Sequence, residues 1–451
     1  MKRVLYAVAA LVVAGVAAIL VFANQVAAVG AGYMAKVACS EIFLAHRPER
    51  AVMEGEFRDI SPVFDYLTHR IDRAGKSVRV SLYGLGRAKA VYRDGYGCTL
   101  AHGASPAPPP PPAPVRAAAM DMATRGSPAA RDDIDYAAID RAMDAAFNDA
   151  TAATRAILVV KDGAIIAERY AAGFDETTPF LSWSMAKSVT ASMVGAAVLR
   201  GLVDVNAPAP VPEWRNDAAR AAITWNDLLQ MQSGLAFDET YNDPQSDVSK
   251  MLFRARDAGA VAANRKLEHA PGTFWSYSSG ATNLIQRTLR DTLEANDVDY
   301  HAFAREALFN PIGAASFVLE PDPSGVFIGS SFVYATARDW ARLGMLYLGD
   351  GVSRAGRLLP EGWSDYVATP ASASDGFYGA QFWLNRPGKD GRPQYIPGAP
   401  EDAYLMAGHE GQYVFIAPDR NLVIVRTGMT RGVEPMPLVA PTLAAIYAAV
   451  E

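Results

Sequence analysis

The segment Ser184-Met185-Ala186-Lys187 places an alcohol and an amine three residues apart, and it is the only S-x-x-K in the chain. The small, apolar residues at 189–200 that follow predict a buried helix. Because residues i and i+3 are neighbours on a helix, the lysine amine is expected to reach the serine hydroxyl. A desolvated lysine can take the proton of a serine and make it a nucleophile. The pair therefore predicts covalent acyl transfer.

A second segment offers a phenol and another hydroxyl, Tyr277 and Ser279, directly ahead of a predicted helix at 281–289. Besides a nucleophile, acyl transfer needs a base and a proton donor for the leaving group. We expect Tyr277 to deliver the proton to the leaving group. The residue types leave open whether Lys187 or Tyr277 accepts the proton of Ser184.

The third segment is His409-Glu410-Gly411, which stands before a predicted strand beginning at Gln412. An oxyanion hole needs preorganised N–H donors, and we expect them to be the backbone amides of Ser184 and Gln412. The loss of one such donor typically raises the barrier by about 3 kcal/mol. Gly411, with no side chain, would let a substrate approach this strand closely.

Two predicted β-hairpins, at 155–170 and 412–427, must position these groups. Each lies beside a predicted helix at one end of the region 134–451, which indicates a single antiparallel sheet flanked by helices. Residues 180–350 are helix-rich and predict an all-helical subdomain. We therefore expect an α+β domain with its site in a cleft where the two parts meet.

The N-terminus carries an uninterrupted apolar run at 4–23, preceded by Lys2 and Arg3. Twenty helical residues span the roughly 30 Å hydrocarbon core of a bilayer. No clean small-residue cleavage site follows, which favours an uncleaved membrane anchor over the alternative, a long signal peptide. The two cations should stay cytoplasmic, so the rest of the chain is expected on the far side, in a bacterium the periplasm.

Residues 33–102 predict a small β-rich module that contains a hairpin at 77–92. Cys39 and Cys98 are the only cysteines of the chain. On the oxidising side of a membrane we expect them to form a disulfide that closes this module. The proline- and alanine-rich stretch at 103–133 predicts an extended linker to the larger domain.

Several classes of function are excluded by the composition and by missing motifs. The net charge of −6 and the lack of basic runs argue against nucleic acid as a partner. The chain has no G-x-S-x-G and no H-E-x-x-H, so neither an α/β-hydrolase nor a zinc protease is expected. No metal and no cofactor are predicted. The expected partners are a small amide or ester substrate and a lipid bilayer at residues 4–23.

Residues 135–450 resemble the serine β-lactamase, DD-peptidase and esterase superfamily, most closely its branch with 6-aminohexanoate-dimer hydrolase. The resemblance implies a β-lactamase/transpeptidase-like fold, a covalent acyl-enzyme and no metal. It also implies that Ser184 is the nucleophile and that Lys187 and Tyr277 share the role of base. The residues that carry it are Ser184 to Lys187, Leu228 to Gly234, Pro271-Gly272-Thr273 with Tyr277 to Ser279, and Gly408 to Gln412.

Three further positions receive a role from this resemblance. Ser279 takes the third position of the tyrosine motif, where many relatives have asparagine, and can hydrogen-bond the lysine or a substrate amide. His409 replaces the lysine of the K-T-G found in most β-lactamases, which removes the cation that pairs with the drug carboxylate and argues against β-lactam hydrolysis. Tyr241 lies in the loop after Ser233-Gly234, at a distance from the serine similar to that of a loop tyrosine that contacts the amide in the dimer hydrolases.

The leading prediction is hydrolysis of a small linear amide, such as an ω-amino-acid oligomer. The alternatives are a carboxylesterase and a D-amino-acid peptidase or DD-peptidase that acts on cell-wall fragments. A non-catalytic sensor or scaffold of the same fold is the second alternative. Such a protein would be expected to lose Ser184, Lys187 or Tyr277, and all three are present.

Overall fold

A computed structural model describes residues 2–101, 131–389 and 391–451, and these residues form two compact units. The N-terminal unit combines residues 2–101 with 238–256 and 322–324. The C-terminal unit holds the remaining described residues. All of the predicted linker at 103–133 except its last three residues lies outside the described residues.

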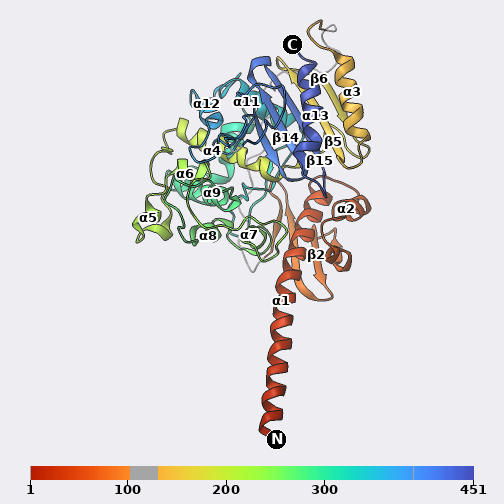
Figure 1. The fold of residues 1–451 in the computed structure, drawn as a ribbon, viewed down its shortest axis with the longest axis vertical. Coiled ribbons are helices and arrows are strands. Elements are labelled where there is room, and N and C mark those ends of the chain that lie inside the picture. Colours follow the sequence, from red (N-terminus) through yellow and green to blue (C-terminus); the bar gives the residue numbers. More distant parts are fainter. Residues whose placement is uncertain (1, 102–130, 390) are drawn as a thin grey trace. The chain divides into compact units, whose positions relative to one another are not determined.

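The N-terminal unit is built on α1 (Lys2–Phe43), a single continuous helix of 42 residues (Figure 1). Its first half is exposed, whereas from Ala27 onward most of its residues are buried. The predicted apolar helix at 4–23 therefore continues, and its second half becomes the core helix of the predicted small module. The small side chains of this second half allow close packing. At Gly32, a Cβ atom would lie 2.5 Å from the carbonyl oxygen of Phe253. By length and composition alone, α1 is suited to cross a membrane, a test that a signal sequence also passes.

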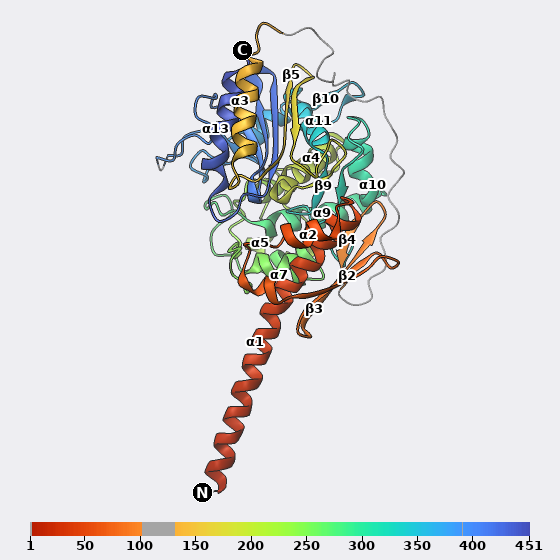
Figure 2. The same ribbon diagram turned by 90° about the vertical axis from the view of Figure 1, so that its right-hand side faces the viewer.

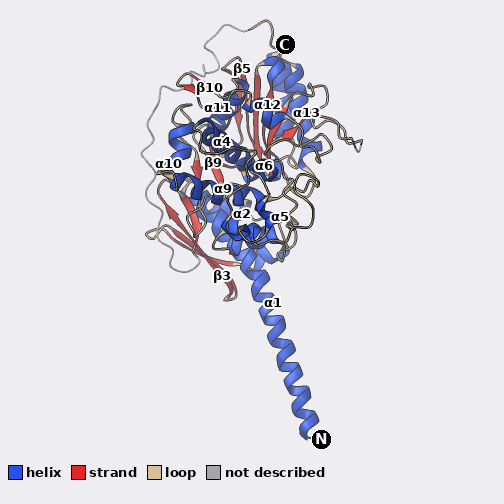
Figure 3. Ribbon diagram, turned by 90° about the vertical axis from the view of Figure 1, so that its left-hand side faces the viewer, coloured by secondary structure: helices blue, strands red, loops and turns tan. Residues whose placement is uncertain are grey.

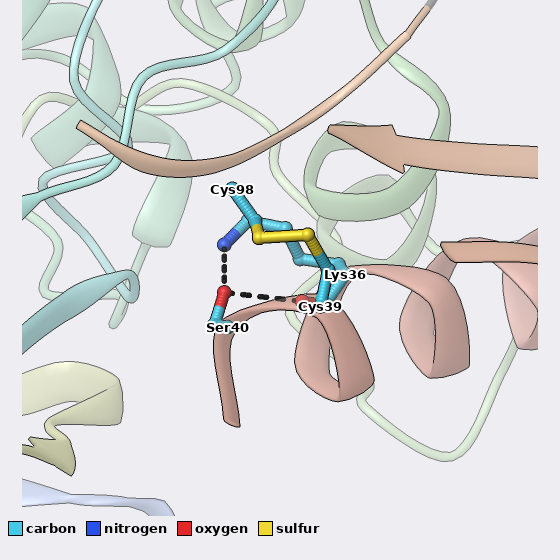
Figure 4. Close-up of a disulfide and its surroundings, with 4 residues drawn as sticks. All are labelled: Lys36, Cys39, Ser40 and Cys98. Carbon is cyan, nitrogen blue, oxygen red and sulfur yellow. Dashed lines mark hydrogen bonds between the residues drawn. A yellow bond between two sulfur atoms is a disulfide. The ribbon is translucent and has the colours of Figure 1, made fainter. Parts of the chain in front are cut away.

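A four-stranded antiparallel sheet packs against α1, with the strand order β1-β2-β3-β4. The predicted disulfide between Cys39 and Cys98 is confirmed; it joins α1 to β4 across a Cα–Cα distance of 6.0 Å (Figure 4). The strands of this unit are β1 (Thr68–Asp72), β2 (Ser77–Leu82), β3 (Leu85–Arg93) and β4 (Gly97–Leu100). Its other helices are α2 (Glu49–Gly55), η1 (Pro62–Tyr66) and α7 (Asp247–Arg254).

The C-terminal unit contains a six-stranded antiparallel sheet of order β12-β13-β14-β15-β5-β6, which includes both predicted hairpins. Its strands are β5 (Thr154–Lys161), β6 (Ala164–Tyr170), β12 (Trp383–Leu384), β13 (Tyr404–Gly408), β14 (Gln412–Ala417) and β15 (Leu422–Gly428). The terminal helices α3 (Tyr136–Asn148) and α13 (Pro435–Ala448) cover one face, where Ile157, Phe415 and Ile424 form the core with them. The other face packs on α11 (Ala337–Leu348) (Figure 3).

Because both faces of this sheet are covered by helices, its central strands are continuous apolar runs rather than alternating apolar and polar residues. On the α11 side, Val414 and Val423 approach Gly344 so closely that a Cβ there would lie 3.0 Å and 2.8 Å from their methyl groups. The predicted α+β fold with an antiparallel sheet flanked by helices is confirmed.

The predicted helix-rich stretch at 180–350 also contains a small sheet of order β7-β9-β8. Its helices in the C-terminal unit are η2 (Trp183–Met185), α4 (Ala186–Leu199), η3 (Pro212–Trp214), α5 (Ala218–Ala221), α6 (Trp225–Leu229), α8 (Ala258–Ala263), α9 (Ser279–Glu294), α10 (Tyr300–Ala304) and the π-helical η4 (Arg305–Phe309). The remaining elements are β7 (Phe180–Leu181), β8 (Val318–Leu319), β9 (Val333–Ala335), β10 (Val352–Ser353), β11 (Gly356–Arg357), α12 (Trp363–Ala368), η5 (His409–Gly411) and η6 (Pro418–Arg420).

Candidate active site

Ser184 lies in the one-turn helix η2, immediately before α4, which carries Lys187 on its first turn. The amine of Lys187 donates a hydrogen bond to the hydroxyl oxygen of Ser184 over 3.0 Å. Ser184 is half-buried, whereas the side chain of Lys187 is buried at 1% exposure. The structure therefore brings the two residues of the motif into direct contact, with the amine shielded from water.

The amine of Lys187 has two further oxygen partners within the core. It donates to the hydroxyl of Ser279 at 3.0 Å and to the backbone carbonyl of Ser330 at 3.1 Å. It also lies over the ring of Tyr277, 4.7 Å from the ring centroid. Burial disfavours an ammonium ion, while oxygen acceptors and an aromatic face favour it. Residues from three segments that are far apart in the sequence thus converge on one amine.

Asn283 and Ser330 support this centre, although sequence analysis assigned neither of them a role. The amide of Asn283 donates to the hydroxyl of Ser330 at 3.0 Å and accepts from its backbone N–H at 3.2 Å. These bonds fix the loop whose carbonyl meets Lys187. One signal was available for Asn283: it follows Ser279 by four residues and so shares its face of α9.

The ring of Tyr277 is held by three neighbouring aromatic residues. Its centroid lies 5.4 Å from that of Trp383, 6.0 Å from that of Tyr378 and 6.5 Å from that of Trp275. Such edge and tilted contacts restrict the rotation of the ring. Because the ring is fixed between Lys187 and this aromatic cluster, the phenol presents an ordered group next to the serine–lysine pair.

The turn at Ser184 packs against the end of β13 in the C-terminal unit. At Gly408, a Cβ atom would lie only 2.2 Å from the carbonyl oxygen of Ser182 and 3.2 Å from the backbone nitrogen of Ser184. Only glycine permits this approach.

The side-chain amide of Gln412 donates to the Gly428 carbonyl at 2.6 Å and accepts from the Gly428 N–H at 3.2 Å, which ties β14 to β15.

Glu410 links the η5 turn to Trp183, the residue that precedes Ser184. Its carboxylate accepts a hydrogen bond from the indole N–H of Trp183 at 3.2 Å and forms an ion pair with Arg431. Both Trp183 and Glu410 have left-handed backbone conformations, with φ of 45° and 60°. Such strain in non-glycine residues persists only where the surrounding structure holds it. The buried Glu410 therefore fixes the turn that carries Ser184.

We expect Glu410→Ala to lower kcat on a chromogenic ester on the order of 100-fold with little change in KM, because a small displacement of the reacting group has this effect. Glu410→Gln keeps an acceptor for Trp183 and should lose less. Steady-state kinetics would measure both, with circular dichroism to show that the variants are folded. Equal losses in the two variants would instead make the ion pair with Arg431 the decisive contact.

His409 is exposed to solvent, and its ring lies edge-to-face with Trp183 at a centroid distance of 5.7 Å. Desolvation by the neighbouring protein atoms lowers the pKa of the imidazole below its ordinary value of 6.5. The positive charge of Arg431 lowers the pKa further, against the opposing effect of Glu410. At neutral pH the imidazole is therefore uncharged.

The backbone conformation and the packing at position 411 require glycine. Its φ is +83°, and a Cβ atom would lie 2.3 Å from Nη1 of the buried Arg426. Arg426 in turn donates to the Gly411 carbonyl at 2.7 Å.

Tyr241 belongs to the N-terminal unit, is 46% exposed and donates its hydroxyl to Glu239 at 2.6 Å. Its contact with a substrate stays a prediction.

Comparison with known proteins places the chain in a family. The sequence model of the family described as Beta-lactamase matches residues 139–449. A 6-aminohexanoate-dimer hydrolase of Paenarthrobacter ureafaciens is 27% identical over 291 residues, which cover 60% of this chain and 72% of that protein. The range 139–449 that the family model matches includes the segments of Ser184, Tyr277 and His409.

Two solved structures share the fold at low sequence identity. A family VIII carboxylesterase is 14% identical with a TM-score of 0.54, over 70% of this chain and 97% of the other. A penicillin-binding protein homologue from Pyrococcus abyssi is 16% identical with a TM-score of 0.53, over 70% of this chain and 78% of the other. Since the family model covers most of the chain, this protein belongs to the β-lactamase family of hydrolases.

Proposed function

We propose that this protein is a serine hydrolase that cleaves a small linear amide through an acyl-enzyme on Ser184. The observation that carries the proposal is the 3.0 Å hydrogen bond between the Ser184 hydroxyl and the buried amine of Lys187. A serine hydroxyl beside a shielded amine is the arrangement that activates a nucleophile without a metal or a histidine.

The reaction follows from the groups around Lys187. The oxygen of Ser184 attacks the substrate carbonyl while its proton passes to Lys187 or Tyr277, and the backbone amides of Ser184 and Gln412 stabilise the oxyanion. Collapse of the tetrahedral intermediate breaks the C–N bond, and Tyr277 delivers a proton to the departing amine. The proton taken from Ser184 replaces the one that Tyr277 gave up, so the base is free again. Water then attacks the acyl-enzyme and loses a proton to this base, which returns it to the Ser184 oxygen as the acid is released.

The substrate class rests on the surroundings of the site. The rings of Trp275 and Trp383 lie next to Tyr277 and are partly exposed, so they offer apolar surface that suits a methylene chain. A relative that is 27% identical is named for the hydrolysis of 6-aminohexanoate dimer. This compound is a linear amide whose carboxylate lies at the far end of a methylene chain from the scissile nitrogen. These observations favour an ω-amino-acid oligomer.

The uncharged His409 also bears on the choice between substrates. In β-lactams and D-alanyl-D-alanine peptides the carboxylate is attached to the carbon next to the scissile nitrogen, so it needs a cation close to the reacting centre. His409 provides none at neutral pH, because its pKa lies below the ordinary value. This favours a carboxylesterase over a DD-peptidase as the second candidate function.

Turnover of four substrates would test the proposal: 6-aminohexanoate dimer, p-nitrophenyl esters, D-alanyl-D-alanine peptides and nitrocefin. We expect the highest kcat/KM with the dimer among the amides, and low values with the peptide and nitrocefin. Turnover of p-nitrophenyl esters with no detectable turnover of any amide would favour a carboxylesterase. Nitrocefin as the best substrate would contradict the argument from His409.

We expect His409→Lys to raise kcat/KM for nitrocefin relative to p-nitrophenyl acetate by about 10- to 100-fold, since a hydrogen bond to a charged group contributes about 1.5–3 kcal/mol. The ester lacks a carboxylate and serves as the internal reference. His409→Gln, which adds no charge, is the matched control and should leave the ratio near that of the wild type. An unchanged ratio in His409→Lys would show that position 409 does not face the substrate carboxylate.

We further propose that residues 4–23 anchor the chain in a membrane with the C-terminal unit on the periplasmic side. The exposed first half of α1 supports this, as does the position of the two cations Lys2 and Arg3 before the apolar run. The continuity of α1 supports an uncleaved anchor, because cleavage after residue 23 would cut the helix just before its buried half.

A further inference from the structure

The sheet of the N-terminal unit carries a row of three cations on one face. The strand register places Arg70 directly opposite Arg79, and Arg79 directly opposite Lys89. Arg70 and Arg79 are exposed and Lys89 is partly exposed. The intervening residues Val78 and Val80 point to the other face and are buried. The three positive charges therefore lie side by side across β1, β2 and β3 on the face that is open to solvent.

This arrangement has no explanation within the fold. Like charges directly opposite each other on neighbouring strands destabilise a sheet. Within the part of the chain that the structure describes, no ion pair involves any of these three residues, whereas Arg73 pairs with Glu49. Asp72, also on β1, accepts a hydrogen bond from the backbone N–H of Gly75 at 2.9 Å and forms no ion pair with these cations among the described residues. Negative charge from outside the chain would offset the repulsion.

The hairpin between β2 and β3 lies beside α1 at the point where the apolar run of the helix ends (Figure 2). The backbone N–H of Gly86 donates to the side chain of Asn24 at 2.8 Å. At Gly86 a Cβ atom would lie 2.4 Å from the backbone of Ala27, so only glycine allows this contact. Asn24 is the first residue after the run 4–23. The tip of the hairpin is thus fixed at the level of this boundary.

Tyr83 occupies the tip of the hairpin and is 77% exposed. Its φ of 47° turns the chain at the tip, so an aromatic residue stands where glycine or asparagine would be less strained. Tyrosine is enriched at the interface between membrane and water. Arg79 stands about 13 Å from Tyr83 along the strand, at about 3.3 Å per residue. A tip at the headgroup layer would leave this cation near the membrane surface.

We propose that the Tyr83 tip and the row Arg70, Arg79 and Lys89 form a lipid-binding surface that takes the phosphate groups of anionic headgroups. The inference rests on the proposed anchor at 4–23, whose hydrocarbon-spanning length would end at Asn24. Basic residues close to a bilayer are attracted to anionic lipid. Since the Debye length is about 10 Å at 0.1 M salt and about 30 Å at 0.01 M, cations about 13 Å from the tip are attracted most strongly at low ionic strength. The surface would hold the N-terminal unit against the membrane, independently of catalysis in the C-terminal unit.

A fluorescent label at the tip would test this surface in the full chain. Both native cysteines are bonded to each other, so Tyr83→Cys provides the single reactive thiol under non-reducing conditions. The protein is placed in vesicles of phosphatidylcholine alone or with phosphatidylglycerol, each containing a headgroup-linked quencher. Asp94→Cys is the matched control, because Asp94 is 83% exposed beyond the opposite end of β3. We expect strong quenching at position 83, stronger with phosphatidylglycerol and weakened by salt, and little quenching at position 94.

The cations are tested by adding Arg79→Glu and Lys89→Glu to Tyr83→Cys, which should abolish the extra quenching by phosphatidylglycerol. The milder pair Arg79→Gln and Lys89→Gln guards against misfolding, and Arg50→Glu on α2 is the control for charge alone. Carbonate extraction, which removes proteins that do not span the membrane, separates the proposed anchor at 4–23 from the proposed lipid-binding surface. A chain that stays in the membrane pellet while position 83 is unquenched would overturn the lipid-binding surface alone. Release of the chain by carbonate would overturn the anchor and the surface with it.

Discussion

Ser184→Ala is expected to abolish labelling by a fluorophosphonate and to lower kcat for any amide or ester on the order of 10⁵-fold or more. The variant removes the half-buried hydroxyl that we propose as the nucleophile and that accepts a hydrogen bond from the Lys187 amine. In serine hydrolases the loss of the nucleophile has effects of this size. The measurement is gel fluorescence of the labelled protein, together with ester hydrolysis.

Ser353→Ala is a suitable control for this experiment, since Ser353 lies in the short β10–β11 hairpin and donates to the Gly356 carbonyl at 3.1 Å. That variant should be labelled like the wild type. A wild-type protein that is folded and yet unlabelled would favour the non-catalytic scaffold over the hydrolase. Labelling that persists in Ser184→Ala would move the nucleophile to another residue.

Tyr277→Phe is expected to lower kcat for amides by about 10²- to 10⁴-fold, the usual contribution of general acid catalysis. p-Nitrophenyl esters should lose much less, because p-nitrophenolate leaves without receiving a proton. The substitution keeps the ring beneath the Lys187 amine and its contacts with Trp383 and Tyr378, so the site should remain ordered. Steady-state kinetics on 6-aminohexanoate dimer and p-nitrophenyl acetate provide the comparison.

The same experiment separates the two possible bases. If Tyr277 is the group that accepts the Ser184 proton, the Tyr277→Phe variant will lose ester and amide hydrolysis to a similar extent, because both begin with that transfer. If Lys187 is the base, the variant will lose amide hydrolysis but keep most of its ester hydrolysis. Rates of fluorophosphonate labelling report the first step alone and should agree with the ester result.

Much of the catalytic domain could be predicted because its signals are local. The hairpins at 155–170 and 412–427 show strands and turns within one short segment, and the structure contains both. The contact between Ser184 and Lys187 needs only a helix, since the two residues stand one turn apart. The predicted disulfide needed only the count of cysteines and the expected compartment.

Other parts of the site depend on contacts between segments that are distant in the sequence. Ser330 meets Lys187 through its backbone carbonyl, which any residue type could supply, so the sequence held no sign of it. Glu410 follows an exposed histidine, and its burial arises only when Trp183 and Arg431 approach it. The strand β12, with two residues, is too short to show a periodic pattern.

The unbroken course of α1 has a mechanical consequence in an anchored chain. Transmembrane helices adapt to a thinner or thicker bilayer mainly by leaning away from the membrane normal. α1 runs without interruption from its exposed half into its buried half. A tilt of the membrane-spanning half would therefore tilt the N-terminal unit with it. Bilayer thickness would thereby set the angle at which the β2–β3 hairpin meets the surface.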